Sequence, residues 1–159
     1  MRGLRGVAWF LAVLALVPWA SAEVYHSDWW DVSHCGYCWN FSTHPGLLES
    51  MEWEEYSVSN GLVSILRTDQ KHLSALRAAL SGLREAEAKA ARGEKVETCG
   101  MCDAIGLVLL AGAEKEHIPT PDGEITLLTS GDARVVVEIH AILERNEAES
   151  RRAAEFAKQ

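Results

Sequence analysis

The tetrapeptide Cys-Gly-x-Cys occurs twice in the sequence, and its two copies contain every cysteine of the chain. The first copy spans Cys35 and Cys38, and the second spans Cys99 and Cys102. Two such pairs can present four thiolates to one metal ion, form disulfides, or act as redox sites. The sequence that follows each copy therefore decides whether the four sulfurs can meet.

Each copy precedes the same succession of expected elements: a short helix, a strand, a tight turn, a second strand and a long helix. Asn60-Gly61 and Asp122-Gly123 are dipeptides typical of two-residue hairpin turns. After each turn, apolar and polar residues alternate with the period of a strand, in 63–65 and again in 125–127. The shared phase of the two patterns indicates an internal repeat.

Both hairpins lead into sequences typical of amphipathic helices. Asp69 and Asp132 are residues that favour helix N-caps, and apolar residues then recur at helical spacing in 73–80 and 136–143. We therefore predict an α+β fold in which the duplicated unit forms a four-stranded antiparallel sheet. Helices cover one face of this sheet, and a pseudo-two-fold axis relates the two copies. If the motifs lie near that axis, the four cysteines converge.

The N-terminus has the features of a cleavable secretory signal. Arg2 and Arg5 form a basic start, 7–17 is a short apolar run, and Ala20-Ser21-Ala22 resembles a cleavage site. The apolar run is shorter than the roughly 20 residues that span a bilayer. We expect an exported protein, periplasmic or secreted, whose mature chain has no transmembrane span.

The expected organisation is a signal peptide in 1–22 and a single duplicated domain in 23–159. Repeat one covers about 33–93 and repeat two about 97–146, and the charge-rich 147–159 is expected to be an exposed or fraying polar helical tail. The signal removes two arginines and no acid, so 15 basic residues become 13 against 23 acidic ones, a formal net charge near −10. This charge disfavours nucleic-acid binding, which needs a basic face.

The paired motifs predict a metal site formed by Cys35, Cys38, Cys99 and Cys102. Four thiolates are the usual ligands of closed structural zinc, and they also suit Cu(I). The order of CxxC, helix, hairpin and helix resembles the heavy-metal-associated domains of copper chaperones, in which a cysteine pair opens the first helix. The leading GMxC of that family is absent here. His34 and His44 flank the first pair and rank below the cysteines as ligands.

A thiol–disulfide oxidoreductase is the alternative from another class. The CGYC at Cys35–Cys38 resembles the active-site tetrapeptide of bacterial disulfide isomerases, and this resemblance implies a thioredoxin fold with a nucleophilic first cysteine. The hairpins predict an antiparallel sheet instead. A third interpretation is a module clipped by structural disulfides, which tend to form in oxidising compartments. The sequence leaves these alternatives open.

The segment before and around the first motif is rich in aromatic residues, including Trp29, Trp30 and Trp39. This segment either packs around the cysteines or binds a protein partner, and an exposed edge strand would allow a homodimer. No glycine-rich phosphate loop or Ser-His-Asp grouping is readable in the sequence. We expect a binding protein rather than an enzyme.

Overall fold

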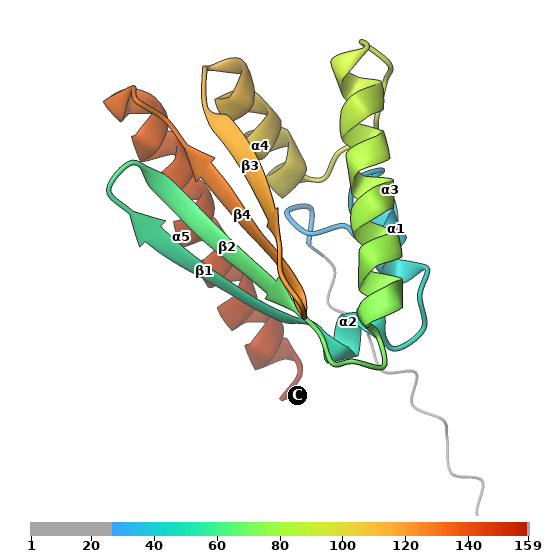
Figure 1. The fold of residues 1–159 in the computed structure, drawn as a ribbon. Helices are drawn as coiled ribbons and strands as arrows, with labels where there is room; N and C mark the ends of the chain where they lie inside the picture. The colour runs from blue at the N-terminus through green and yellow to red at the C-terminus, as the bar shows by residue number, and fades with distance from the viewer. Residues whose placement is uncertain (1–26, 159) are drawn as a thin grey trace, which may run out of the picture.

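The structure is a computed structural model that describes residues 27–158. The expected signal peptide in 1–22 lies outside the described residues. Along the described chain, helices and strands follow in the order α1 (Trp39–Ser42), α2 (Leu47–Ser50), β1 (Glu52–Val58), β2 (Gly61–Arg67), α3 (Leu73–Ala91), α4 (Gly100–Leu110), β3 (Glu114–Pro119), β4 (Gly123–Thr129) and α5 (Ala133–Phe156) (Figure 1).

The four strands form one sheet in the order β1-β2-β4-β3, and every pairing is antiparallel. This confirms the predicted α+β fold with a four-stranded antiparallel sheet. The two hairpins meet through their second strands, where Ser64 pairs with Thr126 at the centre. The two central strands are therefore the inner strands of separate hairpins, and the two edges of the sheet are β1 and β3.

The sheet has a symmetric register about the Ser64–Thr126 pair. An offset of 62 residues maps β2 onto β4, and it also maps the β1–β2 pairing onto the β3–β4 pairing. The same offset relates two connecting hydrogen bonds: Thr68 N donates to Asp122 O at 3.1 Å, and Ser130 N donates to Asn60 O at 2.9 Å. The pairing is that of a pseudo-two-fold axis normal to the sheet.

The helices follow this symmetry less closely. The first motif precedes α1 and α2, each of four residues, whereas the second opens α4, which has 11 residues. The internal duplication as such stays a prediction.

The predicted turns of both hairpins are displaced by one residue. Val58 pairs with Gly61, so Ser59 and Asn60 form the first turn and Gly61 begins the strand. In the second hairpin, Thr120 N donates to Gly123 O at 3.0 Å, so Pro121 and Asp122 form the turn and Gly123 begins the strand. The reason is a close approach between the central strands: a Cβ on Gly61 would overlap the carbonyl oxygen of Leu128. Gly123 meets Leu66 O in the same way. Both glycines thus serve the β2–β4 contact.

The helices cover one face of the sheet and divide the core into two clusters. One cluster packs α4 and α5 onto Leu62 and Leu128, and the other packs α1, α2 and α3 together beside Leu66. The strand residues in between point to the opposite face, which no described helix covers (Figure 1). That open face includes Tyr56, 51% exposed, and Ile118, 38% exposed.

The segment 147–158 is helical to Phe156 and most of its positions are exposed, which agrees with the expected polar helical tail, but Glu149 is an exception. Helix α5 continues without a break to Phe156, and Glu149 within it is only 1% exposed. Its carboxylate pairs with Arg145 at 2.8 Å and with Arg152 at 2.6 Å, and it accepts a hydrogen bond from Ser27 at 3.0 Å. The polar composition of this segment does not predict the burial of Glu149, because the contacts that bury its carboxylate include Ser27 of the N-terminal segment.

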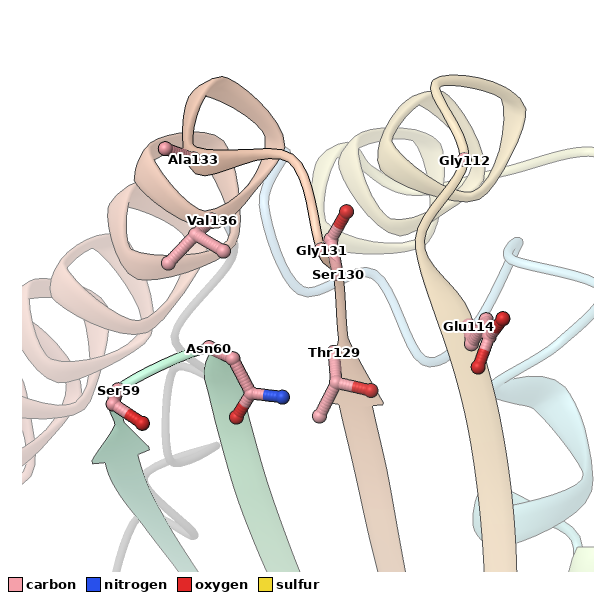
Figure 2. A pocket seen from close by; sticks show the side chains of 9 residues that line it. All are labelled: Ser59, Asn60, Gly112, Glu114, Thr129, Ser130, Gly131, Ala133 and Val136. Carbon is pink, nitrogen blue, oxygen red and sulfur yellow. The ribbon is translucent and has the colours of Figure 1, made fainter.

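At one end of the sheet, the first hairpin turn and the links at Gly112 and Ser130 surround a surface depression of about 470 Å³ (Figure 2). Of its nine lining residues, one, Glu114, is charged. Most of the other lining residues have small side chains, so this depression offers few side-chain groups that could bind a ligand specifically. No helix among residues 27–158 has the length and apolar character needed to cross a membrane.

Candidate metal centre

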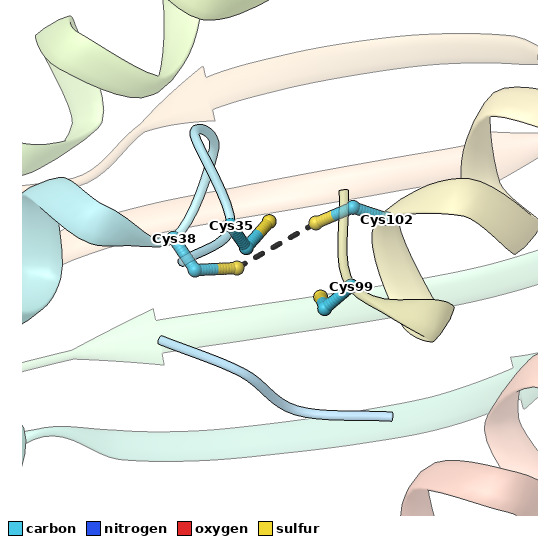
Figure 3. Close-up of side chains that lie close together, drawn as sticks. All are labelled: Cys35, Cys38, Cys99 and Cys102. Carbon is cyan, nitrogen blue, oxygen red and sulfur yellow. Dashed lines mark hydrogen bonds between the residues drawn. The ribbon is translucent and has the colours of Figure 1, made fainter. Parts of the chain in front are cut away.

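The four cysteines converge on one point, as the sequence predicted. Their Sγ atoms all lie within 4.8 Å of one another, and those of Cys38 and Cys102 are 3.5 Å apart. Figure 3 shows Cys35 and Cys38 on the loop before α1, facing Cys99 and Cys102 at the start of α4. Each motif contributes two sulfurs, so the cluster joins parts of the chain that lie 64 residues apart.

The first motif is held as a tight turn. The amides of Cys38 and Trp39 both donate to the Cys35 carbonyl, at 3.1 and 2.8 Å. The Gly36 amide donates to Glu97 O at 2.8 Å, and a Cβ on Gly36 would lie 2.8 Å from Val96 Cγ1. Glycine at this position therefore admits the chain that leads into the second motif.

The second motif opens a regular helix. Cys99 is the N-cap residue of α4, and its carbonyl accepts from the Asp103 amide at 2.9 Å. The amides of Gly100 and Met101, which are free at a helix start, donate to the carbonyls of residues 28 and 29 at 2.8 and 3.1 Å. A Cβ on Gly100 would lie 2.9 Å from the Trp29 ring. Each motif glycine is thus required by a close approach of the segment before the other motif.

Trp29 anchors the N-terminal segment, residues 27–42, to the helix α5. Its indole Nε1 donates to Asn146 Oδ1 at 2.7 Å, and Asn146 Nδ2 donates to Glu55 Oε2 at 2.8 Å. The guanidinium of Arg145 lies 5.6 Å from the centre of the Trp29 ring. Trp29, which packs against the second motif, is therefore fixed by a partly buried chain of hydrogen bonds through Asn146 to Glu55. Trp39, by contrast, is 51% exposed.

The sulfurs differ in burial and in proton affinity. Cys35 and Cys99 are 1% and 4% exposed, while Cys38 and Cys102 are half-buried. Hydrogen bonds from Cys102, and then from Cys38 and Cys99, lower the pKa of the Cys35 thiol. The contact with Cys102 also lowers the pKa of Cys99, to about 6, whereas the contact with Cys35 raises the pKa of Cys102. The proton affinities of the four sulfurs are therefore coupled, and repulsion between like charges disfavours four thiolates together unless a cation lies among them.

The two histidines near the first motif take no part in the cluster. The ring of His34 is exposed and its Nδ1 lies 2.9 Å from an Asp31 carboxylate oxygen. His44 contributes a carbonyl that accepts from the Leu47 amide at 3.1 Å. The ranking of both below the cysteines agrees with this geometry.

Sequence reasoning missed the residues that bring the two motifs together. The segment before each motif contacts the other motif through Asp28, Trp29, Val96 and Glu97. The glycine in each motif was the one sequence feature that indicated such a close approach. The cluster is chemically suited to a thiophilic ion, since four thiols at this separation can close a tetrahedral shell. No family model, curated protein or solved structure matches the chain.

Proposed function

We propose that the protein binds one zinc ion through Cys35, Cys38, Cys99 and Cys102, and that the ion fixes the N-terminal segment to the rest of the domain. The supporting observation is the convergence of all four Sγ atoms within 4.8 Å. Zn–S bonds of about 2.3 Å in a tetrahedron place neighbouring sulfurs about 3.8 Å apart. Small side-chain movements therefore suffice to complete the shell.

The burial of two ligands favours a structural zinc over a copper(I) carrier. A carrier exchanges its ion with thiols of a partner, which must reach the donor sulfurs. Cys35 and Cys99 are almost fully buried, so a partner cannot reach these two donor sulfurs. A closed set of four thiolates is also the arrangement typical of structural zinc. The free energy of zinc binding then stabilises the fold, and the protein does not transfer the ion to a partner.

The second candidate is a disulfide between the motifs, favoured by the 3.5 Å separation of the Cys38 and Cys102 sulfurs. The bond requires an S–S distance of about 2.05 Å and the loss of two electrons and two protons to an external oxidant. We also propose that the protein is exported, on the basis of the signal-like sequence in 1–22. Export into an oxidising compartment makes this candidate the main competitor of zinc.

Metal and thiol analysis of one untreated sample separates the two candidates. The protein is isolated without chelators or reductants, its metals are measured by mass spectrometry, and its thiols are titrated after denaturation with chelator. We expect about one zinc and four thiols per chain. Two disulfides and no metal would contradict the proposal, and one copper in place of zinc would identify the carrier. The same analysis of a Cys38→Ser variant should find the zinc lost, whereas Ser33→Ala, changed at an exposed position beside the first motif, should keep it.

A further inference from the structure

A cavity of about 260 Å³ lies between the helix-covered face of the sheet and the helices above it. Ser64 and Thr126, the central pair of the sheet, line its floor. Val32 and Met101 also line it, so the cavity lies beside the cysteine cluster without including any cysteine. Residues of both hydrophobic clusters line the cavity, which therefore lies between the two clusters.

Most of the lining side chains are apolar. They come from both central strands, from α3 and α4, and from the segments around α1 and α2. An apolar cavity of about 150 Å³ accommodates a benzene ring, so a volume of about 260 Å³ suits a body of roughly ten to twelve heavy atoms. The apolar side chains that matter for this argument are Leu62, Leu66, Leu80, Leu83, Ile105 and Leu128.

One lining residue, His117, has a polar atom without a partner. Its Nε2 is buried and has no hydrogen bond within the described part of the chain. The nearest charged oxygen, Glu87 Oε2, lies 3.8 Å away, which is beyond hydrogen-bond range. A buried ring nitrogen in this state normally costs free energy, because burial removes its bond to water. The atom is therefore a feature that a ligand can satisfy.

The other ring nitrogen defines which chemistry would satisfy Nε2. Nδ1 of His117 lies 2.9 Å from a carboxylate oxygen of the buried Glu124, and a carboxylate can only accept. We assign the proton to Nδ1 on this ground, which leaves a lone pair on Nε2. Burial lowers the pKa of His117 and keeps the ring neutral. The missing partner is a hydrogen-bond donor.

The charged groups around His117 are already paired. Arg84 forms an ion pair with Glu124, and Lys115 forms one with Glu87. The carboxylate of Glu55, on the other side of the floor, accepts from Asn146 at 2.8 Å. Since Arg84 and Lys115 are both paired, an anionic ligand would enter an apolar space without a free positively charged partner, at a large desolvation cost. An uncharged ligand avoids this cost.

We propose that this cavity binds a small uncharged molecule that has a compact apolar body and one hydroxyl group, with the hydroxyl donating a hydrogen bond to His117 Nε2. The class includes phenols and alcohols of the stated size. The apolar body fills the space between the sheet and α3 and α4. The hydroxyl fixes the orientation of the molecule toward β3.

Calorimetric titration with three matched probes tests this proposal on the purified full chain with its native metal content. The probes are 2-naphthol, naphthalene and 2-naphthoate. We expect 2-naphthol to bind about three- to tenfold more tightly than naphthalene, which is the usual contribution of one hydrogen bond, and 2-naphthoate to bind most weakly. Equal affinities for 2-naphthol and naphthalene, or no binding of any probe, would overturn the proposal.

Two substitutions locate the effect. His117→Phe keeps a ring of similar size and removes the acceptor, so the preference for 2-naphthol over naphthalene should disappear. His34→Phe is the matched control, because it makes the same substitution at an exposed histidine that does not line the cavity and leaves His117 intact, so the preference should persist. Persistence in His117→Phe would contradict the assigned contact.

A third variant and a spectroscopic measurement distinguish loss of ligand binding from misfolding of the chain. Ser64→Leu fills the floor of the cavity and should weaken 2-naphthol and naphthalene alike, while far-ultraviolet circular dichroism stays that of the unsubstituted chain. The ¹⁵N resonance of His117 Nε2 should move on addition of 2-naphthol and stay in place with naphthalene. Unchanged affinity in the filled variant, or an unmoved resonance at saturation, would place the probe elsewhere and refute the site.

Discussion

The Sγ atoms of Cys38 and Cys102 lie 3.5 Å apart, although 64 positions separate the two residues in the chain. Each is the second cysteine of its motif, and together they form the half-buried side of the cluster. We predict that Cys102→Ser abolishes stoichiometric zinc binding, because oxygen is a poorer ligand than thiolate for this ion. Zinc content measured by mass spectrometry checks the loss, with Ser33→Ala as the exposed control. Full zinc retention in the cysteine variant would exclude Cys102 as a ligand.

The contact between Gly36 and Val96 gives a prediction about how the motifs are held. A Cβ on Gly36 would lie 2.8 Å from Val96 Cγ1, closer than such atoms approach. We expect Gly36→Ala to lower zinc affinity by about tenfold or more, since overpacking typically costs about 1–3 kcal/mol. Adding Val96→Ala should restore most of the affinity. Competition with a chromophoric chelator measures each value.

Gly106 provides the matched control for that substitution. It lies within α4, and a Cβ there would meet no atom within 4 Å. Gly106→Ala should leave zinc affinity unchanged and stabilise the helix by about 0.5–1 kcal/mol. If Gly36→Ala behaves like Gly106→Ala, or if Val96→Ala gives no rescue, the close approach does not position the first motif.

Glu55 makes the stability of the fold depend on pH. Burial raises the pKa of its carboxyl above the ordinary value of 4.5. Folding therefore favours the protonated form, and the chain loses stability as the pH rises through the raised pKa. We predict that Glu55→Gln gains free energy of unfolding relative to the unsubstituted chain between pH 4 and pH 8, with the smallest difference at pH 4. Urea unfolding at each pH gives the curve.

Glu54 is the control for the pH experiment. It lies on the open face and pairs with Arg67 at 3.2 Å, with both side chains well exposed. Glu54→Gln should show no such rise with pH. A flat difference for Glu55→Gln, or one that falls with increasing pH, would show that the half-buried carboxyl of Glu55 does not destabilise the fold at neutral pH.

The buried carboxylate of Glu149 is expected to contribute to docking of the N-terminal segment. Glu149→Ala removes the acceptor of the Ser27 hydroxyl and the partner of two arginines. Because the arginines can turn to water, we expect a loss of about 1–3 kcal/mol in the free energy of unfolding rather than the larger cost of an unpaired buried charge. The same substitution at Glu147, 60% exposed and 3.7 Å from Arg151, should cost about 0–1 kcal/mol. Equal losses at both positions would contradict the account.

Much of the sheet was predictable because short-range patterns encode it. Alternation in 63–65 and 125–127 identified the central strands, and the repeated Asn-Gly and Asp-Gly dipeptides located the hairpins. Both turns were misplaced by one residue, because the requirements on Gly61 and Gly123 come from Leu128 O and Leu66 O, which are atoms of the other hairpin. A rule for local turns contains no information about that contact.

The sequence predicted which cysteines form the cluster, but it did not predict the contacts that hold them together. The two motifs identified the four cysteines that converge, and the expected repeat gave a reason for their convergence. The residues that close the site, such as Trp29 and Val96, and those of the cavity, such as His117, are scattered along the chain. Their roles arise from tertiary packing, which no periodic pattern records. Glu149 was missed for the same reason, since its composition is that of a solvent-exposed helix.

Zinc K-edge X-ray absorption on the protein isolated without chelators tests the central claim most directly, because it reports the ligand atoms and their distances from the ion. The four-thiolate site predicts a single shell of four sulfurs at about 2.3 Å and no nitrogen or oxygen in the first shell. A first shell containing two sulfurs with nitrogen or oxygen neighbours at about 2.0–2.1 Å would contradict the proposal that both Cys-Gly-x-Cys motifs hold one ion.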